Sequence, residues 1–250
     1  LDELNGIIEP FSFRVRKEDC LDLPDKVYTK RTVELTKEQA ALYEQMKRNA
    51  LAIIQGEGLV TASTVLTQML RLQQVCSGFA KLEDDRVVTV PSNKLTELMS
   101  AIEEIDGKVI IWGNFTHDLH LIGDALKKAY GTESVALFYG ETPTEERQDI
   151  VENFQDPANP LRFFVGQPRT GGYGLTLTEA NTVIYYSNGY DLEVRLQSED
   201  RAHRIGQTNK VTYIDLVVEN TLDEKVLQAL RSKIDISTQV MAEDYKQWIV

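Results

Sequence analysis

The 250-residue sequence lacks several features that would assign it to a common class of protein. No apolar run approaches the roughly 20 residues that a membrane span needs, so we expect a globular chain with no membrane partner. The chain opens with Leu1 and has no signal-peptide pattern, which indicates a fragment or a processed product. Its two cysteines, Cys20 and Cys76, lie far apart without a CxxC or a histidine partner. We therefore expect reduced or buried thiols and an intracellular protein.

Positive charge is also scarce, because the formal net charge is −12. An acidic balance of this size argues against a uniformly basic nucleic-acid-binding surface. It leaves room for a local basic strip, since a few well-placed side chains and backbone amides are enough to bind phosphates. One such strip is QSEDRAHRIGQ at 197–207, in which two arginines and a histidine fall within four residues.

Known nucleotide-binding loops are missing. The sequence has no GxxxxGK[ST], no Asp-Glu pair that ends an apolar strand, and no GxGxxG after the first strand of a βαβ unit. It does contain QPRTGGYGLTLTEA at 167–180, whose Gly171, Gly172 and Gly174 would expose N–H groups suited to phosphate oxygens. A tight turn between a strand and a helix would explain the same glycines equally well.

Short apolar runs alternate with amphipathic segments from residue 93 onward. The apolar runs are rich in β-branched and aromatic residues, which is typical of buried strands, and lie at 108–115, 134–140, 161–167, 181–188 and 211–220. Helical patterns lie between them at 94–105, 118–130, 144–154 and 193–201. Thr144 is the expected N-cap of the third of these helices. The alternation predicts an α/β fold, a parallel sheet with helices on both faces.

Residues before about 92 follow a different pattern. A strand is expected at 27–35, and a helix capped at Thr36 follows it. A long helical region comes next, interrupted by Gly56 and Gly58. These patterns predict an N-terminal, mainly helical arm attached to the α/β domain. At the other end, 220–241 is expected to form a closing helix.

The basic strip places two arginines three residues apart. If it were helical, Arg201 and Arg204 would share one face with Gln197, one turn earlier. Two guanidinium groups on one face repel unless an anion lies between them, and a phosphate matches their forked donors. For an isolated RxxR, a surface ion pair with the carboxylate at 199 or 200 is the simpler explanation, and His203 is better explained as a packed residue than as a general base. Arginine fingers without a nucleotide cradle would be half of a site, completed by another domain or chain.

Several motifs, in the same order along the chain, resemble those of the Swi/Snf-type ATPases of helicase superfamily two. DRAHRIGQ is similar to their motif VI, KVIIWGNF to motif IV and GGYGLTLTEANTVIYYS to motif V. GETPTEERQDIVENFQ matches the family's G-x-[ST]-x-x-x-R stretch, PFSFRVRKEDCLDLPDK resembles the end of the first lobe, and LRLQQVCSG resembles the helical protrusion. The resemblance covers nearly the whole chain.

Three departures from the family pattern concern motifs V and VI. The WNP that precedes motif VI is replaced by Tyr190, Asp191 and Leu192, and the asparagine of motif V by Thr176. The residues before the glycines of motif V are Gln-Pro-Arg, at 167–169. These differences resemble the prokaryotic or viral branch of the family more than the eukaryotic nucleosome remodellers.

The resemblance implies a RecA-like fold and a chain divided into four parts. These are the end of the first motor lobe with its linker (1–35), the helical protrusion (36–91), the second RecA-like lobe (92–235) and a C-terminal helical tail (236–250).

The resemblance also implies the roles of individual residues at the nucleotide. In the family, ATP lies between two RecA-like lobes, so Arg201 and Arg204 would be arginine fingers and Gln197 would begin their motif. Gly172 and Gly174 would lie near the phosphates. ATP and Mg would be held mainly by a first lobe that this chain lacks, so the isolated chain would be inactive.

Motifs IV and V face DNA in the family, which implies contacts with the backbone of double-stranded DNA. The residues concerned are Gly113, Asn114, Thr116, Gly171, Thr176 and Thr178. The resulting hypothesis is the second motor lobe of an ATP-dependent double-stranded DNA translocase, with the N-terminal RecA-like lobe as its partner. Such a protein would be cytoplasmic in a prokaryote or an infected host cell, and nuclear in a eukaryote. The alternative is a RecA-like module that binds DNA or protein without turnover.

Overall fold

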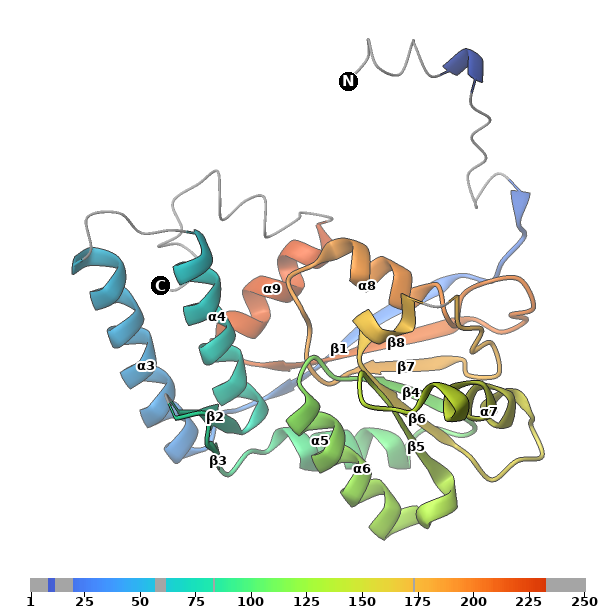
Figure 1. The fold of residues 1–250 in the computed structure, drawn as a ribbon, viewed down its shortest axis with the longest axis horizontal. Coiled ribbons are helices and arrows are strands. Elements are labelled where there is room, and N and C mark those ends of the chain that lie inside the picture. The colour runs from blue at the N-terminus through green and yellow to red at the C-terminus, as the bar shows by residue number, and fades with distance from the viewer. Residues whose placement is uncertain (1–8, 12–19, 57–61, 83, 173, 233–250) are drawn as a thin grey trace.

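The computed structural model describes residues 9–11, 20–56, 62–82, 84–172 and 174–232. Within them, six parallel strands form one sheet in the order β1-β8-β7-β4-β6-β5 (Figure 1). The strands of this sheet are β1 (Lys26–Val33), β4 (Val109–Trp112), β5 (Val135–Phe138), β6 (Phe163–Gly166), β7 (Thr182–Tyr185) and β8 (Val211–Val218). The helices are α3 (Lys37–Gly56), α4 (Ala62–Ser77), α5 (Lys94–Glu103), α6 (Thr116–Tyr130), α7 (Thr144–Gln155), α8 (Leu192–Glu199) and α9 (Leu222–Arg231). Short 3-10 helices lie at η1 (Glu9–Phe11), η2 (Thr132–Ser134) and η3 (Pro168–Gly172), and an antiparallel hairpin joins β2 (Phe79–Lys81) to β3 (Val87–Thr89).

Helices cover both faces of the sheet, as the continuous apolar strands predict. In β4, Val109 and Ile111 pack against α5 and α6 in one apolar cluster, because alternate side chains point to opposite faces. Ile110 and Trp112 point the other way, into a second cluster that includes residues of α7. The expected α/β fold with a parallel sheet is therefore confirmed.

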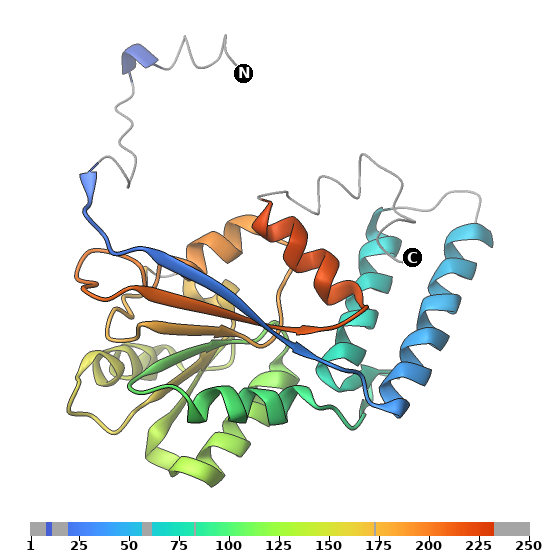
Figure 2. The same ribbon diagram turned by 180° about the vertical axis from the view of Figure 1, so that it is seen from behind.

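The strand expected at 27–35 has a place in this sheet. Strand β1 pairs in parallel with β8 over eight residues, from Lys26 opposite Val211 to Val33 opposite Val218. Figure 2 shows β1 as the edge strand, alongside β8, which is far from it in the sequence. This part of residues 1–35 is thus built into the α/β body.

The expected helical arm consists of α3, α4 and the hairpin. The two helices lie side by side in both ribbon views and meet the body through α9 (Figures 1 and 2). Thr36 caps α3 as expected: its Oγ1 accepts from the Gln39 amide at 3.1 Å, and the Gln39 side chain accepts from the Thr36 amide at 3.1 Å. This reciprocal pair is a capping box.

One expected cap is wrong. Helix α7 begins at Thr144, but the N-cap residue is Pro143 and no side chain caps the helix. Proline fixes its own φ in a range suited to this entry, so the turn forms without the Thr144 hydroxyl. The expected closing helix is found as α9, whereas the tail at 236–250 lies outside the described residues.

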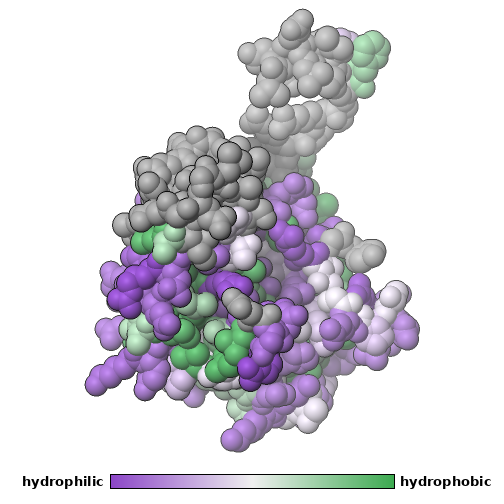
Figure 3. Space-filling model, turned by 60° about the vertical axis from the view of Figure 1, so that its left-hand side comes forward, coloured by the Kyte–Doolittle hydropathy of each residue, from purple (hydrophilic) through white to green (hydrophobic). Residues whose placement is uncertain are grey.

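The face of the molecule shown in Figure 3 is mostly polar where its residues are described. Hydrophilic residues cover much of the face shown in Figure 3, with smaller groups of hydrophobic residues between them. Of the helices in the described ranges, none is long and apolar enough to cross a membrane. Both cysteines are free, Cys20 exposed and Cys76 buried, which confirms the expected thiols.

Candidate functional site

The loops that carry the predicted site residues leave the carboxyl ends of three neighbouring strands, β7, β4 and β6. The amide of Gly113, after β4, donates to the Gly166 carbonyl of β6 at 3.0 Å. The side-chain amide of Gln167 then reaches the Thr116 hydroxyl at 3.3 Å. Ligands bind at this edge of open parallel sheets. The structure therefore brings the loop at 113–116 against the glycine-rich loop.

Asn114 is held from the β7 side. Its backbone N–H donates to the Ser187 hydroxyl at 2.7 Å, directly after β7. Gly189 lies against its side chain, since a Cβ at that position would approach Asn114 Oδ1 to 3.2 Å. The loop conformation is thus fixed by contacts from both flanking strands.

The glycine-rich loop begins with η3, which contains Gly171 and Gly172. Tyr173 lies outside the described residues, and Gly174 follows with φ +58. A Cβ at Gly174 would meet nothing within 4 Å, so the need for glycine there comes from the backbone conformation.

Arg204 is directed onto this loop. Its Nη1 donates to the carbonyls of Gly174 and Leu175, each at 3.1 Å. These bonds join the basic strip directly to the glycine-rich loop. They leave Nη2 and Nε of the guanidinium as further donors.

Arg201 lies half-buried beside Arg204. Within the part of the chain that the structure describes, nothing accepts a hydrogen bond from its buried Nε. Burial, and then the charge of Arg204, lower the pKa of Arg201. Of the two carboxylates that could have paired with it, Glu199 is buried and bonds to Lys26 and Tyr28. Asp200 also bonds to Lys26, at 3.4 Å, and its charge acts in the opposite direction by raising the pKa of Arg201. Arg201 is therefore a desolvated cation with an unused donor, an arrangement that suits an anion.

From Asp200 onward the basic strip is not helical, so Arg201 and Arg204 do not share one helix face with Gln197. Helix α8 ends at Glu199, and the chain then forms turns through the two arginines. The His203 amide still donates to the Glu199 carbonyl, at 3.1 Å. Gln197 lies on the exposed side of α8 and donates to Glu193 at 2.9 Å. The arginines come together through turns because their backbone is anchored to motif V, where the Leu177 amide donates to the Arg201 carbonyl at 2.9 Å.

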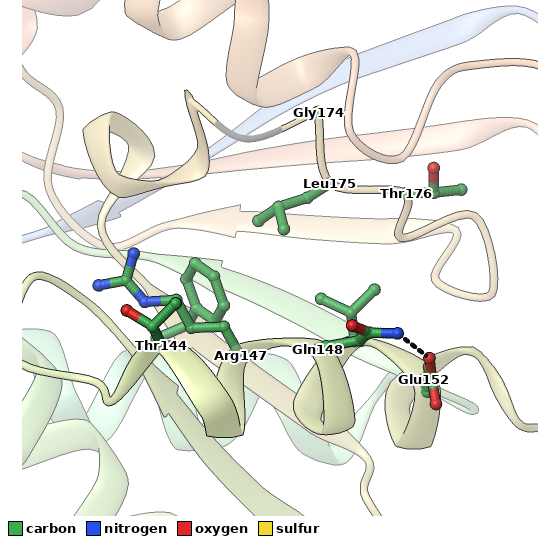
Figure 4. A pocket seen from close by; sticks show the side chains of 9 residues that line it. Thr144, Arg147, Gln148, Glu152, Gly174, Leu175 and Thr176 are labelled. Atoms are coloured by element: carbon green, nitrogen blue, oxygen red, sulfur yellow. Dashed lines mark hydrogen bonds between the residues drawn. The ribbon is translucent and has the colours of Figure 1, made fainter.

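The two threonines of this loop have different surroundings. Thr176 lines a hollow of about 460 Å³ between α7 and the loop, with Leu175, Val151 and Arg147 among its walls (Figure 4). Thr178 is engaged within the protein, because its hydroxyl accepts from Gln155 at 3.0 Å.

Two residues escaped the sequence analysis. The side-chain amide of Gln207, buried, donates to the carbonyls of Thr178, Ala180 and Ala202 at 3.0–3.2 Å and so joins the glycine-rich loop to the basic strip. Its position as the last residue of DRAHRIGQ was the available signal.

Arg195 is the second. It is buried, stacks 3.4 Å from the ring centroid of Tyr185, and binds Asp215 at 2.6 Å and Glu199 at 2.9 Å. An aspartate inside the apolar strand VTYIDLVV was the signal for a buried cationic partner.

His203 is a packed residue, as the sequence indicated. Its Nε2 lies 2.7 Å from the Pro24 carbonyl, next to the start of β1. Among the described side chains, no group of three or more His, Cys, Asp or Glu gathers as a metal site would require. The charged groups that this edge brings together for a ligand are the guanidinium cations of Arg201 and Arg204.

Comparison with known proteins gives two family matches. Residues 1–79 match the SNF2-related domain, and residues 92–206 match the helicase conserved C-terminal domain. The putative ATP-dependent helicase/translocase YwqA of Bacillus subtilis is 31% identical over 259 residues, covering all of this chain and 28% of the relative. The SWI/SNF chromatin-remodeling complex subunit snf22 of Schizosaccharomyces pombe is 28% identical, covering 96% of this chain and 15% of the relative. The chain thus spans less than a third of the length of these relatives.

Comparison with solved structures gives matches in the same family. The Sulfolobus solfataricus SWI2/SNF2 ATPase core in complex with dsDNA matches with a TM-score of 0.71 and 32% identity, covering 96% of this chain and 53% of that chain. The C-terminal domain of the same ATPase matches with a TM-score of 0.65 and 28% identity, covering 90% of this chain and 92% of that one. The resemblance drawn from the motifs is confirmed: the chain belongs to the Snf2-type helicases, and its α/β body is the RecA-like, C-terminal lobe of that family.

Proposed function

We propose that this chain is the second motor lobe of an ATP-dependent double-stranded DNA translocase, which supplies arginine fingers to ATP held by a first lobe. The observation that carries the proposal is Arg201, a half-buried guanidinium beside Arg204 whose Nε has no hydrogen-bond partner among the described residues. Two neighbouring guanidinium groups, one of them half-buried, are stabilised by an anion, and a triphosphate provides one. Similarity to ATP-dependent helicases supports the choice of ATP.

The residues present suit part of a nucleotide site. Arg201, Arg204 and the amides of Gly172 and Gly174 would bind phosphate oxygens, while the exposed Gln197 would face the first lobe. The described residues offer no carboxylate cluster for Mg, so metal and triphosphate would be held by the first lobe. ATP with its metal would supply the phosphoryl group, and arginine fingers stabilise the charge that develops as it transfers, by roughly 10³ to 10⁵ in rate.

Arg204 would also connect the nucleotide to the glycine-rich loop. Its bonds to the carbonyls of Gly174 and Leu175 use one nitrogen, so a phosphate can be bound by the others. A shift of the guanidinium toward ATP would pull on those carbonyls. A change in the bound nucleotide would thereby change the position of the loop that we assign to DNA contact.

The DNA-facing surface would be the loop at 113–116 together with Gly171, Thr176 and Thr178. Support comes from the related archaeal ATPase core, which was solved with double-stranded DNA. Thr178 is the weakest member, because its hydroxyl is already bonded to Gln155. Contacts of this kind bind the phosphate backbone and carry no base information, as movement along any sequence requires. An enzyme that uses ATP and DNA would work inside the cell.

The test is DNA-stimulated ATP hydrolysis by the full-length protein. We expect duplex DNA to stimulate the wild type, and Arg204→Ala to lose turnover by about 10³ or more. Arg86→Ala is the matched control, because Arg86 is an exposed arginine beside the β2–β3 hairpin. The isolated 250-residue chain should not hydrolyse ATP. Normal hydrolysis by Arg204→Ala would refute the finger assignment, and an inactive full-length protein that still binds DNA would favour the RecA-like module without turnover.

A further inference from the structure

A buried carboxylate joins the helical arm to the α/β body. Asp118, in the first turn of α6, is 0% exposed. Its Oδ2 accepts from the hydroxyl of Ser77 at 3.2 Å and from the hydroxyl of Ser187 at 2.8 Å. Ser77 is the last residue of α4, in the arm, whereas Ser187 follows β7, in the body. One carboxylate oxygen therefore holds both parts.

The same hydrogen bonds continue to the loop at 113–116. The Ser187 hydroxyl that donates to Asp118 also accepts from the backbone N–H of Asn114, at 2.7 Å. A hydroxyl that donates on one side and accepts on the other has its rotation fixed by both partners. If Asp118 moved, the Ser187 hydroxyl would turn, and the Asn114 amide would lose its acceptor.

Aromatic contacts strengthen this joint on the side of the hairpin. Phe79, the first residue of β2, stacks on His117 with ring centroids 4.4 Å apart and meets Phe115 edge-on at 5.3 Å. The arm segment at 77–79 thus contacts both the loop and the start of α6. Gly78, with φ +95, lets the chain turn between the two contacts.

The carboxylate is a costly way to join two parts of a protein. In the described structure, Oδ1 of Asp118 is buried without a hydrogen-bond partner. Burying a polar atom in this way destabilises the folded state, and apolar side chains of similar size would pack the same space more favourably. A carboxylate adds directional hydrogen bonds, because its oxygen accepts from two hydroxyls and so fixes the orientation of both.

We propose that Asp118 is a positioning residue through which the helical arm sets the loop at 113–116 for contact with the DNA backbone. This rests on the proposed function, in which that loop faces DNA. Movement of α4 changes the position of Ser77, Asp118 transmits the change to Ser187, and Ser187 moves the Asn114 amide. The arm therefore controls how tightly the loop at 113–116 binds DNA, although the arm itself does not contact DNA at this loop.

The first readout is hydrogen exchange in the full-length protein, and it needs neither DNA nor ATP. Ser77→Ala, an arm residue that does not contact the loop, should speed exchange of the Asn114 amide by about 3- to 10-fold, the effect expected for one lost hydrogen bond. Asp118→Leu should exceed this, and Asp118→Asn, which keeps an acceptor for both hydroxyls, should restore protection. Ser100→Ala on α5 and Asp124→Asn on α6 are matched controls, because both side chains are exposed.

The second readout is the duplex DNA concentration that half-saturates ATP hydrolysis. Ser77→Ala should raise it about 3- to 10-fold while turnover at saturating DNA changes less than twofold, and Asp118→Asn should stay near the wild type. Unchanged Asn114 exchange in both Ser77→Ala and Asp118→Leu would overturn the proposal. Faster exchange with an unchanged half-saturating DNA concentration would overturn the link to DNA. A wild-type protein that shows no response to DNA would instead be a failure of the proposed function, since the exchange readout is independent of it.

Discussion

At the scale of single residues, the buried Arg195–Asp215 pair is a direct target for stability measurements. The Asp215 side chain is 0% exposed, and its carboxylate also lies 3.4 Å from Arg231. Asp215→Asn would leave the buried Arg195 guanidinium with one carboxylate partner fewer. Removing one member of a buried pair typically costs about 3 to 5 kcal/mol, so we expect a loss of unfolding free energy near the lower end, measured by urea denaturation.

The double variant Arg195→Met/Asp215→Leu separates charge from packing. It removes both ions at once, so it should recover part of the loss, because apolar residues of similar volume often replace buried pairs without cost. Lys210→Met is the control for an exposed pair: Lys210 and Asp25 are 66% and 79% exposed, and we expect a change below about 1 kcal/mol. Equal losses in the single and double variants would show that the pair's charge is not what matters.

At the scale of elements, the capping box of α3 should set the stability of the arm. Thr36→Ala removes the acceptor for the Gln39 amide and should cost about 1 kcal/mol, while Thr36→Ser should cost less because it keeps the hydroxyl. Faster hydrogen exchange in the first turn of α3 would be the local signature. Thr96→Ala, at an exposed position in the first turn of α5, is the control and should be nearly neutral. No difference between Thr36→Ala and Thr96→Ala would contradict the role of the cap.

The elements also show what sequence patterns can predict. Strand β4 and its neighbours were predictable because buried parallel strands are continuous apolar runs, and the Thr36 cap because capping depends on residues three apart. The pairing of β1 with β8 was not, since it joins residues about 180 positions apart and nothing local encodes it. The turns after Glu199 were missed because the backbone bond from Leu177 to Arg201, a tertiary contact, decides where the helix ends.

At the scale of the whole molecule, the motifs predicted candidate site residues but not the contacts that hold them in place. Arg201 and Arg204 were found from DRAHRIGQ, whereas the bonds from Arg204 to Gly174 and Leu175 depend on a crossing of two loops. Buried polar residues such as Asp118 gave no signal, because a single aspartate in an amphipathic helix resembles a solvated one. Their partners come from other elements and are visible once the fold is known.

The buried network around Asp118 also predicts a pH dependence of the whole fold. Burial raises the pKa of Asp118 to about 7, against the hydrogen bond from Ser187 and the charge of Lys94 on α5. Asp223 on α9 adds to the increase and is itself paired with Lys94 at 2.8 Å. An unfolded aspartate titrates near a pKa of about 3.9, so between about pH 4 and 7 the folded state holds a proton that the unfolded state has lost.

Stability from this group is therefore fully present below about pH 4 and is lost as pH rises toward 7, at about 1.4 kcal/mol per pH unit. Asp118→Asn cannot titrate, so the unfolding free energy of the wild type relative to this variant should fall between pH 5 and 7 and level off above pH 8. Urea denaturation of both proteins at pH 5, 6, 7 and 8 measures the difference, with Asp124→Asn as an exposed control on the same helix. A difference that does not change with pH would mean that Asp118 stays ionised in the folded protein. In that case the hydrogen bonds from Ser187 and Ser77 and the charge of Lys94 would outweigh the cost of burial.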